Sequence, residues 1–170
     1  MHRIPATKIP QSLKECYFSA LNLWQGGRYA EREGGLLIAV GLWILALEEI
    51  GKYVLLEEAA ARQDSTGMFE VLGRDFTNHD MKSEKGLAAF KKWGLDLQKV
   101  GIPLTSRMRT GLWFVAWNDE TQEFKRAITE LDPYAITRVH DLGELMLEGL
   151  NRMKELLRIS QVPLALRSGS

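Results

Sequence analysis

The chain is poor in cysteine and in net charge. Cys16 is the single cysteine among 170 residues, which excludes an intramolecular disulfide and fits a reducing compartment. Its 22 basic residues equal its 22 acidic ones, so no overall charge draws it toward nucleic acid or an anionic membrane. Any contact with RNA must therefore come from a local patch of the surface.

The chain also lacks an apolar run long enough to span a membrane. The longest run covers residues 34–47, which is fourteen residues, whereas a membrane helix needs about 20. The first residues carry no apolar signal core. We therefore expect a cytoplasmic protein without membrane contact, in which this run forms a buried core helix.

Several common site motifs are missing as well. The sequence shows no metal-ligand spacing, no glycine-rich phosphate loop after a strand and no Gly-x-Ser-x-Gly elbow. We expect neither a metal nor a cofactor. Cys16 is more simply interpreted as a small buried thiol than as a nucleophile.

Proline is scarce, and its five positions leave long stretches free to be helical. We predict one domain over residues 1–170, with an ordered core at about 10–160. The apolar spacing predicts helices over 10–24, 28–62, 68–99 and 133–159, with a turn at Gly26-Gly27. Short connections between long helices indicate an all-α, up-and-down bundle of four to five helices, with the second at its centre.

Charged residues follow directly on the apolar run, at Glu48, Glu49 and Lys52. A carboxylate at the end of a buried segment costs free energy unless it is paired. Two interpretations stay open: an ion pair between Glu48 and Lys52, four residues apart, or a functional polar cluster. Gly51 costs a helix about 1 kcal/mol relative to alanine, so we expect another backbone or a ligand to approach closely there.

A second polar group lies at residues 74–82. If this stretch is helical, Asp75, His79 and Lys82 share one face, where Asp75 can hold the imidazole in one tautomer. Arg74 supplies a guanidinium, which clamps phosphate well, and Asn78 adds a polar side chain beside them. A histidine and an arginine suffice in principle for metal-free RNA cleavage.

Simpler interpretations of these residues also stand. The Arg-x4-His spacing is weak by itself, and Arg74 can simply pair with Asp75 or Glu70. His140 has no arginine five to seven residues before it, so we expect an ordinary histidine on a helix surface.

The order of several short segments is similar to that of a known family. These segments are Gly-Arg-Tyr-Ala at 27–30, Ala-Leu-Glu-Glu-Ile-Gly-Lys at 46–52, His79-x-x-Lys82 and Gly-Leu-Trp-Phe-Val at 111–115. Together with a long final helix, they resemble the AbiV-type abortive-infection proteins of the HEPN superfamily. The resemblance covers residues 12–158, which is nearly the whole chain.

The resemblance implies a HEPN-like helical bundle that acts as a metal-independent endoribonuclease. The superfamily's motif is an arginine, a polar residue and a later histidine, which Arg74, Asp75 and His79 fit. It further implies a homodimer whose paired motifs meet in a cleft, RNA as the substrate, and a role in stopping phage growth. Polar support for this cleft is expected from Glu48, Glu49, Lys52, Asn78 and Lys82.

A second function stays open. The chain can be a non-catalytic HEPN module that binds RNA, a nucleotide or a phage or host protein, and so regulates translation or a toxin. The balanced net charge favours this alternative, because domains that cut RNA are commonly more basic. A basic rim around His79 would favour the nuclease.

Overall fold

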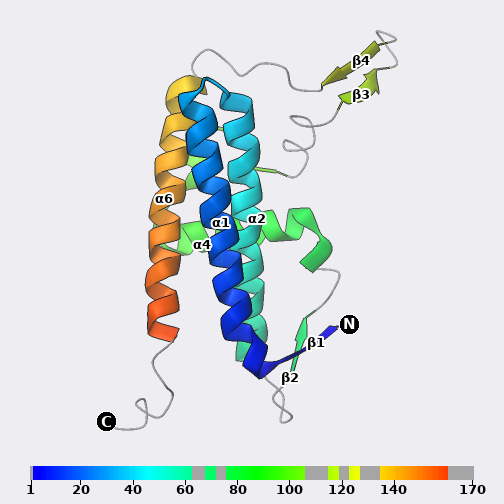
Figure 1. Cartoon of the computed structure of the whole chain (residues 1–170), viewed down its shortest axis with the longest axis vertical. Coiled ribbons are helices and arrows are strands. Elements are labelled where there is room, and N and C mark those ends of the chain that lie inside the picture. Colours follow the sequence, from blue (N-terminus) through cyan, green and yellow to red (C-terminus); the bar gives the residue numbers. More distant parts are fainter. Residues whose placement is uncertain are drawn as a thin grey trace.

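In the computed structural model of the chain, four helices pack against one another (Figure 1). The structure describes residues 2–62, 68–71, 76–105, 115–118, 123–126 and 135–160. The helices are α1 (Ile9–Arg32), α2 (Leu36–Ala61), α4 (His79–Lys92) and α6 (Ala135–Ser160), with short 3-10 turns η1 (Ala6–Lys8) and η2 (Leu97–Val100). Two short antiparallel pairs, β1 (His2–Pro5) with β2 (Met68–Val71) and β3 (Val115–Asn118) with β4 (Glu123–Arg126), lie outside this bundle. The predicted all-α class is confirmed.

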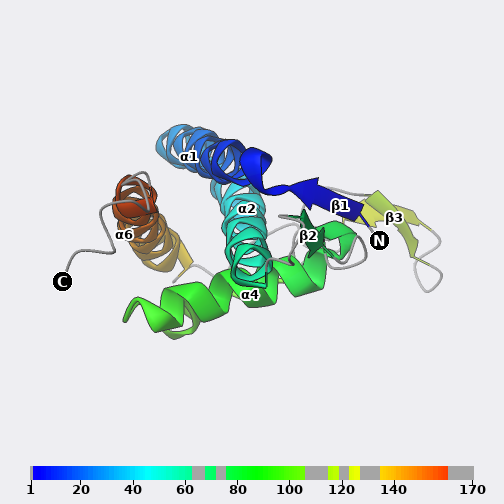
Figure 2. The same ribbon diagram turned by 90° about the horizontal axis from the view of Figure 1, so that it is seen from below.

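Helix α2 occupies the centre of the bundle. It runs antiparallel to α1, α6 lies beside both, and α4 crosses α2 on the side opposite α1 (Figures 1 and 2). Its side chains are buried on several sides, as in Trp43, Ile44, Leu47, Ile50 and Tyr53, each at most 1% exposed. The all-round apolar sequence of this helix correctly indicated its central place.

The first turn lies later in the chain than the sequence predicts. Helix α1 continues through Gly26 and Gly27 to Arg32, and the chain reverses at Glu33–Gly35, where Gly34 has a φ of 79°. Gly27 serves packing instead of a turn, because a Cβ there would lie 2.2 Å from Nε1 of Trp43. The predicted turn at Gly26-Gly27 is therefore wrong.

The third predicted helix is much shorter than residues 68–99. Residues Met68–Val71 form β2, paired with the N-terminal strand, and α4 begins only at His79. Asn78 is extended, with a ψ of 112°, and its side chain accepts hydrogen bonds from the amides of Asp80 and Met81. This N-cap sets the start of α4.

The apolar run of residues 34–47 lies mostly in α2, where neighbouring helices cover it. Across the described residues, no helix combines the length and apolar character that a membrane crossing requires. The fourth predicted helix corresponds to α6, and its expected start at 132–133 lies outside the described residues.

Candidate functional site

Two glycines bring the backbones of α2 and α4 into direct contact. A Cβ on Gly51 would lie 1.9 Å from the carbonyl oxygen of Lys82. A Cβ on Gly86 would lie 2.5 Å from the carbonyl oxygen of Leu47. The expectation that another backbone approaches Gly51 is confirmed, and the costly glycine is explained by this helix crossing.

The crossing places Glu48 of α2 against the first turns of α4. Its Oε2 lies 2.7 Å from Nδ1 of His79 and 3.7 Å from Nζ of Lys82. The Glu48 side chain is 3% exposed and that of Lys82 is 6% exposed, whereas 47% of the His79 side chain is open to solvent. We call these three residues the Glu48 cluster.

This geometry fits an imidazole that moves protons. A carboxylate at Nδ1 fixes the ring orientation and tautomer, which leaves Nε2 as the nitrogen that can exchange a proton with a bound molecule. The ammonium of Lys82 balances the buried charge of Glu48, because an isolated buried carboxylate is strongly unfavourable. Proton transfer at a partly open surface is therefore what the Glu48 cluster can do chemically.

The ion pair between Glu48 and Lys52, one of the two interpretations left open above, is replaced by other pairings. Lys52 contacts Glu49, three residues before it, while Glu48 reaches across to α4. Cys16 of α1 has a raised pKa of about 12, and burial of the thiol is the main cause. The charge of Glu49 raises this pKa further, and the charge of Lys52 lowers it. Cys16 is a buried thiol, as predicted, at 7% exposed.

Two of the predicted catalytic residues cannot be placed beside this cluster. Arg74 and Asp75 lie outside the described residues, so their roles stay predictions. The premise of one continuous helical face from Asp75 to Lys82 is wrong, because the extended Asn78 interrupts it. The carboxylate at His79 is Glu48, which sequence reasoning placed only as support because it lies 31 residues away.

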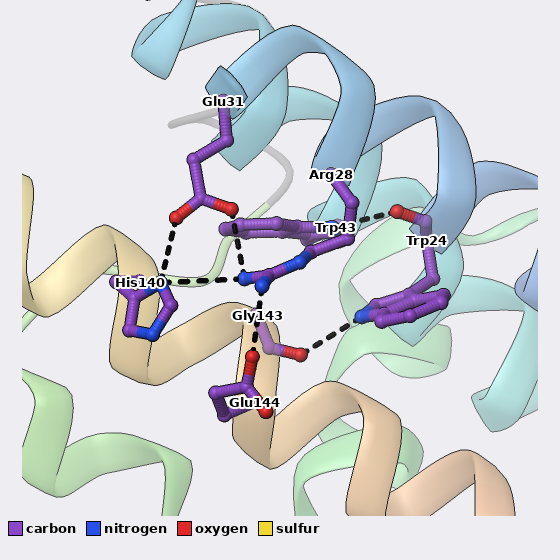
Figure 3. A network of polar contacts seen from close by, with 7 residues as sticks. All are labelled: Trp24, Arg28, Glu31, Trp43, His140, Gly143 and Glu144. Atoms are coloured by element: carbon purple, nitrogen blue, oxygen red, sulfur yellow. Dashed lines mark hydrogen bonds and ion pairs between the residues drawn. The ribbon is translucent and has the colours of Figure 1, made fainter.

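A second polar group joins the last turns of α1 to the first turns of α6 (Figure 3). Arg28 lies 2.8 Å from Glu31 and 2.9 Å from Glu144. His140 places Nδ1 3.1 Å from Glu31. We call these four residues the Arg28 cluster; sequence reasoning missed it, because its partners are more than a hundred residues apart.

A hollow of about 590 Å³ lies between η2 and α6, with Lys99, Val100, Asp141 and Glu144 in its lining, so it borders the Arg28 cluster and not the Glu48 cluster. Within the described ranges, no three His, Cys, Asp or Glu side chains gather as a metal site would require. Comparison with family models, with curated proteins and with solved structures finds no match to this chain. The site must therefore be judged on its own geometry.

Proposed function

We propose that this chain is a HEPN-like, metal-independent endoribonuclease whose proton-transfer residue is His79. The supporting observation is the 2.7 Å contact between Nδ1 of His79, which is half exposed, and the buried carboxylate of Glu48. A buried acid that orients an accessible imidazole is a common arrangement for general acid–base chemistry. The abortive-infection role and a homodimeric state are proposed from the family resemblance.

In the proposed reaction, the 2′-hydroxyl of a ribose attacks the adjacent phosphorus and the bond to the 5′-oxygen breaks. Nε2 of His79 takes the proton from the 2′-hydroxyl while water protonates the departing 5′-oxygen, or it protonates that oxygen while water accepts the 2′-hydroxyl proton. Glu48 is a positioning residue that holds the ring through Nδ1. The products carry a 2′,3′-cyclic phosphate and a 5′-hydroxyl.

The charge that develops on the phosphate needs a cation. Arg74 is proposed for this role because a guanidinium binds phosphate oxygens in bidentate fashion. Asp75 is proposed as a further polar neighbour of the substrate, since Glu48 already occupies the orienting position at His79. Lys82 pairs with Glu48 at 3.7 Å and holds its carboxylate in place.

The test is cleavage of total cellular RNA by purified protein in EDTA. His79→Ala should lower the rate by at least about a hundredfold, which is the usual contribution of a general acid or base. His140→Ala is a matched control, because His140 also contacts a glutamate but is 56% exposed and far along the bundle. Unchanged cleavage by His79→Ala would disprove the mechanism.

One observation favours a non-catalytic binding module as the second candidate. Two lysines of α4, the helix that begins at His79, are each paired with a carboxylate: Lys82 with Glu48 and Lys85 with Glu58. These pairs give the described surroundings of His79 no excess of positive charge for RNA. If wild-type protein leaves RNA intact, this candidate gains support, and binding of labelled RNA or nucleotide would be measured next.

A further inference from the structure

The outer face of α1 carries an unusual set of exposed side chains. Phe18 is 54% exposed and Tyr29 is 68% exposed, and they are two of the three large hydrophobic side chains that stand exposed in the described part of the chain. They are eleven residues apart, which is about three helical turns, so they lie on one face. Exposed aromatic side chains of this kind are enriched where proteins associate.

The same face forms a regular seam with alternating steps of three and four residues. Its members, all exposed, are Glu15, Phe18, Asn22, Gln25, Tyr29 and Arg32. Such spacing is that of the contact positions in two helices packed along each other. We call this set the α1 seam.

The α1 seam is complementary to itself when a second copy runs in the opposite direction. We place the two helices so that the midpoints between Asn22 and Gln25 coincide. Phe18 of one copy then lies opposite Tyr29 of the other, which makes an aromatic pair. The same alignment sets Asn22 opposite Gln25, an amide pair, and Glu15 opposite Arg32, an ion pair. Each pair occurs twice by symmetry, as an isologous interface requires.

The charges at the two ends of the seam are available for such pairing. The recorded contact of Glu15 is with the neutral side chain of Gln11. Arg32 makes no ion pair with any residue that the structure describes. Ser19 and Gly26 flank the seam on one side, and small residues there let two helices approach closely.

We propose that two copies of this chain associate through an antiparallel pairing of their α1 seams. Figures 1 and 2 show a side of α1 that no other helix covers, and the exposure of all six seam residues is consistent with their lying on that side. Helix α4 lies on the opposite side of α2, so this pairing leaves the two Glu48 clusters on the outer faces of the dimer. It therefore differs from the dimer that the family resemblance implies, in which the paired motifs meet in a cleft. The pairing therefore concerns a surface separate from the proposed catalytic site.

The test is sedimentation of the full chain over a range of concentrations, without RNA. Glu15→Arg alone, or Arg32→Glu alone, sets like charges opposite each other at two symmetric places and should raise the dimer dissociation constant by about tenfold. The double variant E15R/R32E restores both pairs and should recover the wild-type constant. Arg158→Glu, an equally exposed change in the last turn of α6, should leave it unchanged.

Recovery in the double variant identifies the antiparallel register, because residues 15 and 32 are too far apart in one helix to touch. A parallel pairing would set each residue opposite its own copy, so it predicts no such recovery. A wild-type chain that stays monomeric at every concentration would overturn the proposal, as would a dimer that ignores Glu15→Arg. A monomer would also contradict the homodimeric state proposed above, whereas RNA cleavage through His79 is tested separately by His79→Ala.

Discussion

Glycines allow close packing both at the α2–α4 crossing and at the junction of α1, α2 and α6. At the crossing the glycine faces a backbone, whereas at the junction the glycines face an aromatic side chain. At the crossing, a Cβ on Gly51 would meet a backbone carbonyl oxygen at 1.9 Å. At the junction, a Cβ on Gly143 would meet the ring of Trp43 at 2.7 Å, and the same ring faces Gly27. A backbone in a helix cannot move alone, whereas a ring can shift, so the crossing is the more rigid of the two.

The ion pairs of the two regions differ in how far they are exposed to solvent. Glu48 at the crossing is 3% exposed, whereas Glu144 at the junction is 51% exposed. An exposed ion pair contributes about 0–1 kcal/mol, but losing one partner of a buried pair costs about 3–5 kcal/mol. The comparison indicates that polar residues are held in fixed geometry where the helices are closest, which is what a proton-transfer site needs.

The strongest test of the comparison is Gly51→Ala. The added methyl group must push α4 away from α2, so we expect the free energy of unfolding to fall by about 3 kcal/mol. Gly26→Ala is the matched control, because a Cβ there meets only Leu42 at 3.4 Å. Since alanine is the better helix former, the control should gain up to about 1 kcal/mol; urea unfolding measures both.

Equal effects of these two substitutions would contradict the proposed rigidity of the crossing. A destabilised Gly51→Ala chain should also lose the contact between Glu48 and His79. The imidazole signals of His79 in a nuclear magnetic resonance spectrum would report this loss directly. The signals of His140, at the far junction, should change little.

Much of this fold follows from residue pattern alone. The apolar run of residues 34–47 predicts the central helix, and Gly51 predicts a close backbone, because both are local signals with a clear physical cost. The first turn was predicted in the wrong place because a Gly-Gly pair has the same sequence pattern in two situations. It can end a helix, or, as at Gly26-Gly27, it can leave space for a tryptophan ring to pack against the helix. Long-range packing decides between these two uses, and one sequence does not contain it.

The candidate site was predictable only in its parts. Glu48 and His79 each carried a local signal, namely a carboxylate after an apolar run and a histidine among polar residues. Their contact depends on how α2 and α4 cross, and the sequence instead favoured the nearby Asp75 as the partner. Helix periodicity failed there because the N-cap at Asn78 makes α4 begin later in the chain than the pattern suggests.

A second prediction concerns alkaline pH and two buried groups, Cys16 of α1 and Tyr53 of α2. Burial raises the pKa of Cys16 from 9.0 to about 12, and burial followed by the charge of Glu57 raises that of Tyr53. Above about pH 9 the unfolded chain loses these protons while the folded chain keeps them, so stability falls as pH rises. From about pH 8 to pH 10.5, Cys16 alone should account for about 2 kcal/mol.

Urea unfolding at the two pH values checks this prediction. Cys16→Ala and Tyr53→Phe should each reduce the loss of stability between the two values. Tyr29→Phe is the control, because the Tyr29 side chain is 68% exposed. An alkaline loss that is the same in all of these variants would show that other groups cause it.

The prediction with the smallest expected effect concerns the junction around Trp43, where the neighbouring group is a ring that can shift. Gly143→Ala should cost about 1–2 kcal/mol, because its methyl group would meet Cη2 and Cζ2 of the indole. Trp43→Phe removes this outer ring, but it also loses the hydrogen bond from Nε1 to the carbonyl oxygen of Trp24. In the double variant the added methyl group is opposed only by Nη1 of Arg28, which lies 2.9 Å away at the end of a flexible side chain. The cost of the double variant should therefore be lower than the sum of the two single costs by about 1 kcal/mol. Strictly additive costs would mean that the indole ring does not oppose the methyl group. The contrast with Gly51 would then be wrong, because the neighbour of Gly51 is a backbone carbonyl that no side-chain substitution removes.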